Sequence, residues 1–371
     1  MDLSAVRPEA VAGGDASRRI RVAVDAMGGD YGAEEVVAGA LEYAREDPSS
    51  ELILVGDEAR IARCISGPLP DHVSLVAASQ VIEMDDQPAL ALREKRDSSI
   101  TVATDLVREG RADAVVSAGH TGAAMAAGVL RLGRLPGVDR PALAVQLLTE
   151  REQPLVLLDI GANPDSTGQN LYQYAHMGAV FAEQVMGVVR PRVALLSIGE
   201  EKGKGDARIV DATARLDHST LDFIGNVEGK DLTRGLADVV VCDAVIGNVV
   251  IKFFEGLSGF IVDQFRAEFR RPPFGPLAAF LLRPGIARIR RRLDWERLGG
   301  APLLGVGGTV IITHGRARRR MIRYAVGVGA AAARARIPER IARALAPGQT
   351  GARLSGEPSA AEAGRPAEAR A

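Results

Sequence analysis

The sequence predicts an α/β fold in which a mostly parallel sheet is flanked by helices. Three observations lead to this prediction. Runs of β-branched residues alternate with helix-compatible stretches along the chain. Several of these runs end in a short turn of small residues that leads straight into a helix. The composition, 47% hydrophobic and 25% charged over 371 residues, is that of a globular protein with a large core.

Six strands are expected, in chain order at 20–24, 51–55, 114–116, 155–159, 192–197 and 238–242. Each precedes a helix-compatible stretch, and strands that alternate with helices usually build a parallel sheet covered by helices. The chain has no repeat at a spacing of about 20 to 50 residues, so solenoids and propellers are not expected.

The two ends of the chain differ in composition from the middle. Residues 1–19 and 347–371 are rich in Ala, Gly, Pro, Glu and Arg and lack hydrophobic periodicity, so both are expected to be mobile tails. Residues 20–346 are then one folded catalytic domain.

Charge and cysteine content exclude several classes of protein. The chain has 46 basic and 47 acidic residues, whereas domains that coat nucleic acid usually carry a basic excess. Cys64 and Cys242 lie far apart, with no Cys or His nearby at metal-ligand spacing, so we expect neither a disulfide framework nor a metal site. A cytoplasmic location fits best, since residues 1–19 hold no secretory signal and no uninterrupted apolar run approaches the roughly 20 residues that span a bilayer.

Five small-residue turns follow predicted strands, at 25–30, 117–122, 159–163, 197–205 and 242–248. In a parallel sheet such turns are expected at one edge, where ligands bind and where helix N-termini offer free N–H groups to an anion. A single turn of this kind usually just closes a tight connection, but five favour an anionic or phosphorylated substrate. The dinucleotide-binding G-x-G-x-x-G and the phosphate-binding P-loop are both absent, which disfavours a nicotinamide site and nucleotide hydrolysis.

Eleven collinear motifs between residues 20 and 335 resemble those of the phosphate acyltransferase family of bacterial phospholipid synthesis. They are VDAMGGD at 24–30, LVGD at 54–57, LREKRDSS at 92–99, SAGHTGA at 117–123, PGVDRPA at 136–142, LDIGAN at 158–163, IGEE at 198–201, FIGNVEG at 223–229, VVCD at 240–243, GNVV at 247–250 and GGAPLLG at 299–305. Each motif alone is weak, but eleven in order are highly specific. The chain departs from the family pattern at His120, at 244–246 and at 307–308.

The resemblance implies an enzyme that converts long-chain acyl-[acyl carrier protein] and inorganic phosphate into acyl phosphate and free carrier protein, for phosphatidic acid and phospholipid synthesis. It implies a fold like that of the isocitrate and isopropylmalate dehydrogenases and the phosphotransacylases, a homodimer, and no cofactor. A downstream membrane glycerol-3-phosphate acyltransferase is a further implied partner. A short-acyl phosphotransacylase or a dehydrogenase on the same fold is the alternative, and a membrane-recruited scaffold without activity is a third hypothesis.

Lys204 and Asn248 are the expected catalytic residues, because each can donate to phosphate or to the oxyanion that develops on the thioester carbonyl. Lysine is rare here, with five of the 46 basic residues, and four of the five lie between 202 and 252. A lysine retained in so Arg-rich a chain is mildly enriched for functional positions. Lys204 could instead be a solvated loop charge, and Asn248 could simply cap a helix that begins at Val249.

The glycine-rich turns supply candidates for phosphate binding through backbone N–H and hydroxyl donors: Gly28, Gly29, Ser117, Gly119, Thr121 and Gly122. His120 is a candidate base or phosphate ligand, although a lone histidine at a turn is more often a structural donor. His314, at the end of a strand, has no assigned role. Cys242 could accept an acyl group, but the Val run before it favours an inert buried thiol.

The segment 253–297 is expected to be an amphipathic helical hairpin inserted in the domain. Between 266 and 292 it carries a net charge of +7, and an uncharged apolar stretch lies within it at 274–282. Such a segment could meet the inner face of the cell membrane, an acidic carrier protein or a second subunit. The contact candidates are Phe280, Leu281, Leu282, Arg288, Arg290 and Arg291.

Overall fold

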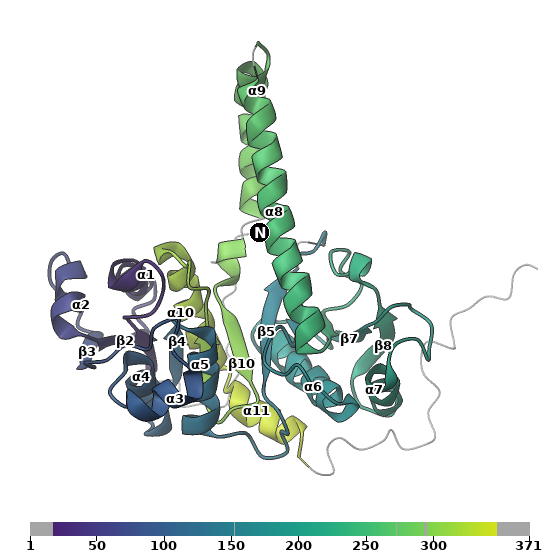
Figure 1. The fold of residues 1–371 in the computed structure, drawn as a ribbon, viewed down its shortest axis with the longest axis horizontal. Coiled ribbons are helices and arrows are strands. Elements are labelled where there is room, and N and C mark those ends of the chain that lie inside the picture. The colour runs from purple at the N-terminus through teal and green to yellow at the C-terminus, as the bar shows by residue number, and fades with distance from the viewer. Residues whose placement is uncertain (1–17, 152, 272, 293–294, 347–371) are drawn as a thin grey trace, which may run out of the picture.

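The computed structural model describes residues 18–151, 153–271, 273–292 and 295–346. Its centre is one sheet of eleven strands in the order β3-β2-β1-β4-β11-β10-β5-β6-β9-β7-β8. Helices cover both faces of this sheet, and a pair of long helices projects from the body (Figure 1). The expectations for residues 1–17 and 347–371 fall outside the described residues.

The strands are β1 (Ile20–Asp25), β2 (Ser50–Gly56), β3 (Val73–Ala77), β4 (Ala114–Ser117), β5 (Ala142–Leu147), β6 (Leu155–Leu158), β7 (Arg192–Leu196), β8 (Asp222–Val227), β9 (Val239–Val241), β10 (Ala301–Leu304) and β11 (Thr309–Ile312). All six strands predicted from β-branched runs are confirmed, as β1, β2, β4, β6, β7 and β9. β3, β5, β8 and β10 were missed, and β11 was expected only as the strand that His314 follows. β5, β10 and β11 lie side by side in the middle of the sheet.

The sheet contains two parallel runs that point in opposite directions. β3, β2, β1, β4 and β11 form one parallel run, and β6, β9, β7 and β8 form the other. Between them, β10 and β5 are each antiparallel to both neighbours. Three reversals separate β11 from β6, so the two runs point in opposite directions. Their carboxyl ends come level with each other in the middle of the sheet instead of forming one edge, because Ala144 of β5 pairs with Leu158 at the end of β6 and Pro302 of β10 pairs with Ile311 near the end of β11. The expectation that all five turns share one edge is therefore wrong.

The helices are α1 (Gly32–Glu46), α2 (Glu58–Cys64), α3 (Pro88–Glu94), α4 (Ser99–Arg108), α5 (Thr121–Ala127), α6 (Gly168–Gln184), α7 (Ala207–Asp217), α8 (Ala244–Arg270), α9 (Gly275–Arg292), α10 (Arg319–Arg334) and α11 (Ile337–Ala344). One face of the sheet packs on α1, α2 and α10 over the first run and on α6, α7 and α11 over the second. The opposite face packs on α4 and α5 over the first run, and on the base of α8 over the second.

Alternating residues on the central strands bury opposite faces of the sheet in separate clusters. In β1, Val22 and Val24 pack against α1 and α10, whereas Ala23 packs against α4. Burial on both faces of a parallel strand requires an apolar run without polar alternation. This pattern explains why β-branched runs were a sufficient signal for the six predicted strands.

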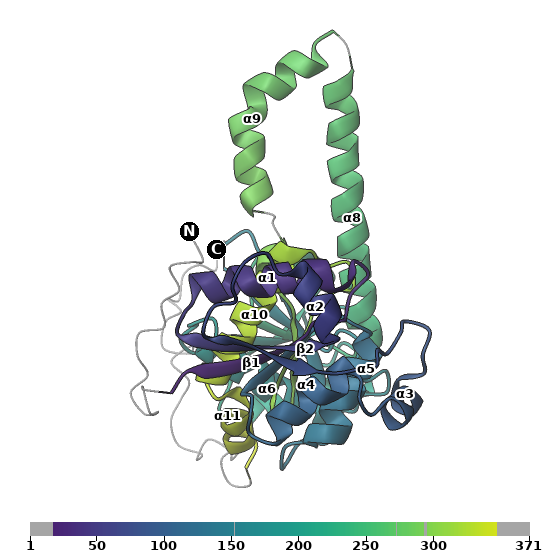
Figure 2. The same ribbon diagram turned by 90° about the vertical axis from the view of Figure 1, so that its left-hand side faces the viewer.

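The predicted hairpin is present as α8 and α9, which rise together from the body (Figures 1 and 2). Its first helix begins at Ala244, earlier than the expected position 253, and α9 ends at Arg292. Among the described helices, α8 is the one whose length and composition would suit a membrane span, with mean hydropathy 1.6 over its most apolar 18 residues. Only 6% of that window is buried, so α8 is no core helix.

Candidate active site

The turns that follow β6, β9 and β7 meet at one edge, because these three strands are neighbours in the sheet. The turn after β6 is organised by Asp159, which is fully buried. One carboxylate oxygen accepts hydrogen bonds from the backbone N–H groups of Gly161 (3.1 Å) and Ala162 (2.9 Å), and the other accepts from Asn163 N (2.8 Å). Burial raises the pKa of Asp159, and these donors oppose that rise. The carboxylate is thus a structural anchor for the turn.

The base of α8 is pressed against this turn at Gly247. A Cβ at Gly247 would lie 1.9 Å from the carbonyl oxygen of Asp159, so the position tolerates no side chain. Asp243 caps α8, and its Oδ1 accepts from Val245 N (2.9 Å) and Ile246 N (3.1 Å). The alternative that Asn248 caps a helix starting at Val249 is therefore wrong.

Asn248 instead lies in the second turn of α8, where its side chain is exposed and lines a groove at the base of the helix. Ile160 and Gly161, from the turn after β6, line the same groove, as do Val145 of β5 and Ile251 of α8. The groove therefore combines an apolar floor with an amide that is free to contact a ligand.

Lys204 occupies the glycine-rich turn after β7, the strand next to β9. Its backbone is fixed, because its carbonyl oxygen accepts hydrogen bonds from Ser197 Oγ (3.2 Å) and Asn226 Nδ2 (3.2 Å). Its side chain is exposed, and no ion pair of its ammonium is found among the described residues. A fixed backbone with a free, mobile cation suits contact with an anionic substrate.

The turns after β1 and β4 lie together at the carboxyl end of the first run. A Cβ at Gly28 would lie 2.5 Å from Gly119 N, so the two turns are in direct backbone contact. Ser117 Oγ donates to Asp25 Oδ2 (2.7 Å) and accepts from Gly119 N (3.1 Å). Ser99 also bonds Asp25, whose pKa is raised by burial. Ser117 is only 2% exposed and is already engaged by a buried carboxyl group.

The cavity among Asp25, Gly28, Ser117, Gly119 and His120 is very small, with a volume of about 10 Å³. That is room for about one water molecule and not for a phosphate ion. The structure thus brings the predicted phosphate-binding residues of these two turns together, but side chains and backbone fill the space between them.

The other predicted site residues near the turns after β1 and β4 differ in their contacts and exposure. His120 caps α5, and its Nδ1 accepts from Gly122 N (3.1 Å), which is the structural role expected for a histidine at a turn. Gly29 has φ +90° and lies against Gly315, beside His314. Nδ1 of His314 accepts from Arg316 N (3.0 Å). Thr121, the first residue of α5, is exposed.

Comparison with known proteins identifies the family. A family model described as "Fatty acid synthesis protein" matches residues 20–340. A protein of Heliobacterium modesticaldum named "Phosphate acyltransferase" is 48% identical over 83% of this chain and 92% of its own length. One of the same name from Thermosynechococcus vestitus is 46% identical over 87% of this chain and 94% of its own. The chain belongs to the phosphate acyltransferase family.

Solved structures show the same fold at low identity. The "EutD phosphotransacetylase from Staphylococcus aureus" is 16% identical, with a TM-score of 0.52, and the match covers 85% of this chain and 95% of that one. A phosphotransacetylase from Streptococcus pyogenes gives a TM-score of 0.55 at 16% identity, covering 85% and 94%. The expected fold class is confirmed, and the relatives named above confirm that the protein is an acyltransferase.

Cys242 of the acyltransferase is inaccessible. It is 1% exposed, and burial raises the pKa of its thiol well above the ordinary range. A reactive thiol needs a lowered pKa and access to substrate. The structure therefore favours the inert thiol over the acyl acceptor.

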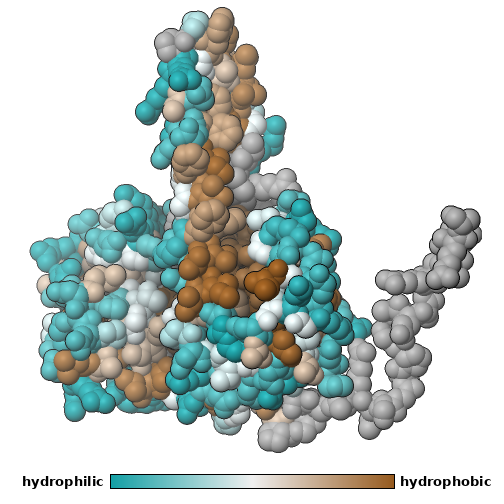
Figure 3. All heavy atoms as spheres, turned by 45° about the vertical axis from the view of Figure 1, so that its right-hand side comes forward, coloured by the Kyte–Doolittle hydropathy of each residue, from teal (hydrophilic) through white to brown (hydrophobic). Residues whose placement is uncertain are grey.

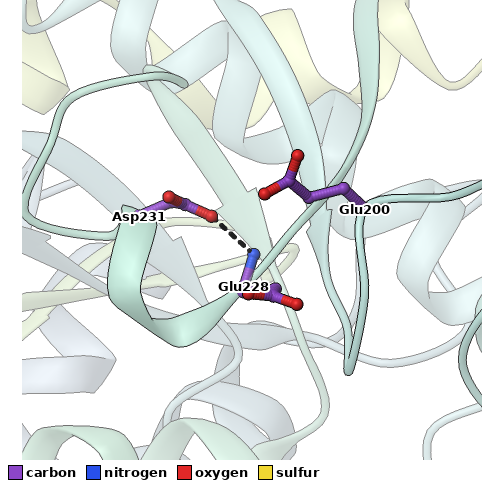
Figure 4. Close-up of side chains that lie close together, drawn as sticks. All are labelled: Glu200, Glu228 and Asp231. Atoms are coloured by element: carbon purple, nitrogen blue, oxygen red, sulfur yellow. Dashed lines mark hydrogen bonds between the residues drawn. The ribbon is translucent and has the colours of Figure 1, made fainter.

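Three carboxylates, Glu200, Glu228 and Asp231, lie within 4.8 Å of one another near the loop that carries Lys204 (Figure 4). Glu228 N donates to Asp231 Oδ2 (3.0 Å). Lys230 Nζ pairs with Glu228 and with Glu200 (3.4 Å), and Arg234 pairs with Asp231 (3.3 Å). Because the chain supplies its own cations, ion pairing accounts for this cluster without a metal.

The hairpin exposes the apolar residues singled out in the sequence. Phe280 is 71% exposed, Leu281 66% and Leu282 54%, and apolar side chains continue along α8 to its base (Figure 3). Arg288 is exposed as well. The side chains of Arg290 and Arg291 lie outside the described ones.

Sequence reasoning missed several residues that build the site: Asp25, Asp159, Asp243 and Gly247. The signals were present. Three of these residues are aspartates that stand at the end of a strand or within two residues after it, where a carboxylate can organise the turn or cap the next helix. Gly247 directly precedes Asn248, and a glycine in the first turns of a helix often marks close backbone approach.

Proposed function

We propose that the enzyme transfers a long-chain acyl group from acyl carrier protein to inorganic phosphate, with Lys204 and Asn248 as the catalytic residues. An oxygen of phosphate attacks the thioester carbonyl carbon, the carbon–sulfur bond breaks, and the carrier protein leaves as a thiolate. The products are acyl phosphate and free carrier protein. The family match over residues 20–340, together with relatives named phosphate acyltransferase, supports the acyl-phosphate chemistry.

The residues near β7 and β9 suit this chemistry. A thiol with a pKa of about 8.5 leaves readily and phosphate is already ionised at neutral pH, so the protein mainly has to position the reactants and stabilise the oxyanion. Holding two reactants in place can supply about 7–11 kcal/mol in the best cases. Lys204 offers an ammonium and Asn248 an amide N–H, both exposed and carried on segments that follow neighbouring strands.

Phosphate binding by the turns of Gly28, Gly29, Ser117, Gly119 and Gly122 remains a proposal about backbone donors. Thr121 is the best supported member of the set, because it is exposed and can contact an anion, whereas Ser117 is buried. Ser117 is better understood as the residue that joins the two turns through Asp25.

We infer in addition that the hairpin brings the enzyme to the inner surface of the cell membrane. Phe274 is 74% exposed at the tip, beside a segment rich in arginine. An apolar tip together with basic residues is the two-signal arrangement that gives stable binding to anionic lipid. The alternative partners of the same surface are acidic carrier protein, a second subunit and the downstream membrane glycerol-3-phosphate acyltransferase.

The test follows thiol release from long-chain acyl-[acyl carrier protein] with and without phosphate, and traps acyl phosphate with hydroxylamine. We expect phosphate-dependent release and a loss of about 100-fold in kcat for Lys204→Ala, which is typical when an oxyanion donor is removed. Lys202→Ala is the matched control, because Lys202 Nζ pairs with Asp217 at 3.2 Å on the protein surface. Phosphate-independent release, or no release, would remove the proposal; binding of a nicotinamide cofactor would support the dehydrogenase alternative.

A further inference from the structure

One guanidinium group joins the N-caps of two helices beside the proposed site. Arg208 lies in the first turn of α7. It bonds the cap of its own helix, since its Nε donates to Asp206 Oδ2 (2.9 Å), and its Nη2 lies 3.3 Å from Oδ2 of Asp243, the cap of α8. The bridge therefore crosses from the helix after β7 to the helix after β9.

The two caps use their oxygens in the same way. Asp206 Oδ1 accepts from Arg208 N (2.9 Å) and Ile209 N (3.1 Å), while Asp243 Oδ1 accepts from the first N–H groups of α8. In both carboxylates the second oxygen is left for Arg208. The guanidinium holds the pKa of Asp206 below its usual range, so that carboxylate stays charged at neutral pH.

Each capped helix carries or follows one of the proposed catalytic residues. Lys204 stands two residues before the cap Asp206, and Asn248 stands five residues after the cap Asp243. The chain around Lys204 is rich in glycine, with Gly203 at φ +90° and Gly205 at φ +109°, so it has little stiffness of its own. Ser197 and Asn226 hold the carbonyl oxygen of Lys204, and Arg208, four residues further on, is the contact that joins this segment to the helix of Asn248.

We propose that Arg208 is a positioning residue, which fixes Lys204 relative to Asn248 by tying the N-caps of α7 and α8 together. This inference rests on the proposed function. Arg208 acts through the two helices and not by contact with substrate. A planar guanidinium can reach two carboxylates at once, whereas an ammonium group at the same place would hold one at a time.

The test is a double-mutant cycle measured by phosphate-dependent thiol release. Arg208→Ala should lower kcat about 10-fold or more and leave the KM for phosphate within about 2-fold, because small misplacements of a catalytic group are costly. In a Lys204→Ala background the same change should cost almost nothing further, since the group that it positions is gone. Arg208→Lys should lie between wild type and Arg208→Ala.

The matched control is Arg215→Ala on the same helix, where Arg215 pairs with Asp211 four residues before it and with Gln169 of α6 (2.7 Å). It should retain wild-type kcat. If Arg208→Ala does not fold, as judged by thermal unfolding, the cycle is run with Arg208→Lys. The inference would be overturned if the losses in kcat of Arg208→Ala and Lys204→Ala multiplied in the double variant. A higher KM for phosphate at unchanged kcat in Arg208→Ala would overturn it as well. A wild-type enzyme without phosphate-dependent release would instead remove the proposed function.

Discussion

Gly247 of α8 lies against the carbonyl oxygen of Asp159, so closely that a Cβ atom would stand 1.9 Å from that oxygen. The contact fixes the base of α8 on the turn after β6, and it thereby sets the position of Asn248 and of the whole hairpin. Both partners are backbone atoms, so neither can move aside by a change of rotamer.

Gly247→Ala should therefore destabilise the protein by about 3 kcal/mol, the upper end of the usual cost of overpacking. Thermal unfolding measures the loss. Gly256→Ala is the matched control in the same helix, because a Cβ atom added there would meet nothing within 4 Å. That variant should gain up to about 1 kcal/mol of helix propensity. Equal unfolding temperatures for the two variants would contradict the close contact.

The buried thiol of Cys242 should take no part in the reaction. We expect Cys242→Ala to keep phosphate-dependent thiol release within about 3-fold of wild type, with a modest loss of stability from the small cavity. Iodoacetamide should label Cys64, which is partly exposed, and leave Cys242 unlabelled in mass spectrometry. An acyl group trapped on Cys242, together with loss of activity in the variant, would favour a covalent intermediate instead.

His176 of α6 should make the protein less stable in acid. Burial lowers its pKa to about 4 from the ordinary 6.5, and its Nε2 has no hydrogen-bond partner among the described residues. Between these two values the unfolded chain binds more protons than the folded one, so stability falls as pH decreases from 6.5 and is fully reduced below 4. The whole effect is about 3 kcal/mol.

Chemical denaturation of His176→Phe across this pH range tests the assignment. The variant should lack this part of the acid destabilisation, while His218→Gln, at an exposed position, should retain it. If the wild type and His176→Phe lose stability in parallel between pH 7 and 4, other groups cause the acid sensitivity.

The sequence was informative where a signal was local. The strand of Val22 to Val24 and the other buried parallel strands are visible as β-branched runs, and the hairpin as a basic, apolar insertion. β10 and β5 gave no such signal: β10 includes Pro302, and β5 alternates at Gln146. Their antiparallel pairing reverses the second run of the sheet, and long-range pairing of this kind leaves no trace in local periodicity.

The same limit explains the errors in the site. Asn248 was a reasonable cap, but Asp243 stands earlier in the chain and accepts from two backbone N–H groups, so it starts the helix first. Ser117 was a reasonable phosphate donor, but its hydroxyl group is bonded to Asp25, a residue 92 positions away in the chain. The first fact had a usable signal in Asp243, an aspartate just after a strand, whereas the second does not follow from residue type or spacing.

The apolar stretch at 274–282, which runs from the tip of the hairpin into α9, provides the last prediction. Leu281→Glu/Leu282→Glu should release the enzyme from vesicles of phosphatidylglycerol and phosphatidylcholine, because two charged groups replace the apolar contact with lipid. Binding of the wild type should weaken as salt is raised, since arginines meet the anionic headgroups. Co-sedimentation measures both effects, and activity on soluble acyl-[acyl carrier protein] should be unchanged.

Met84→Glu/Leu90→Glu is the matched control, because these side chains are 62% and 49% exposed and lie outside the hairpin. It should co-sediment like the wild type. Unchanged binding of the hairpin variant would contradict membrane contact. A raised KM for acyl carrier protein, or a smaller assembly in size-exclusion chromatography, would instead assign this apolar stretch to the carrier protein or to a second subunit. The same pair of substitutions thus identifies the partner of the hairpin, because vesicle binding, the KM for acyl carrier protein and the size of the assembly each respond to a different partner.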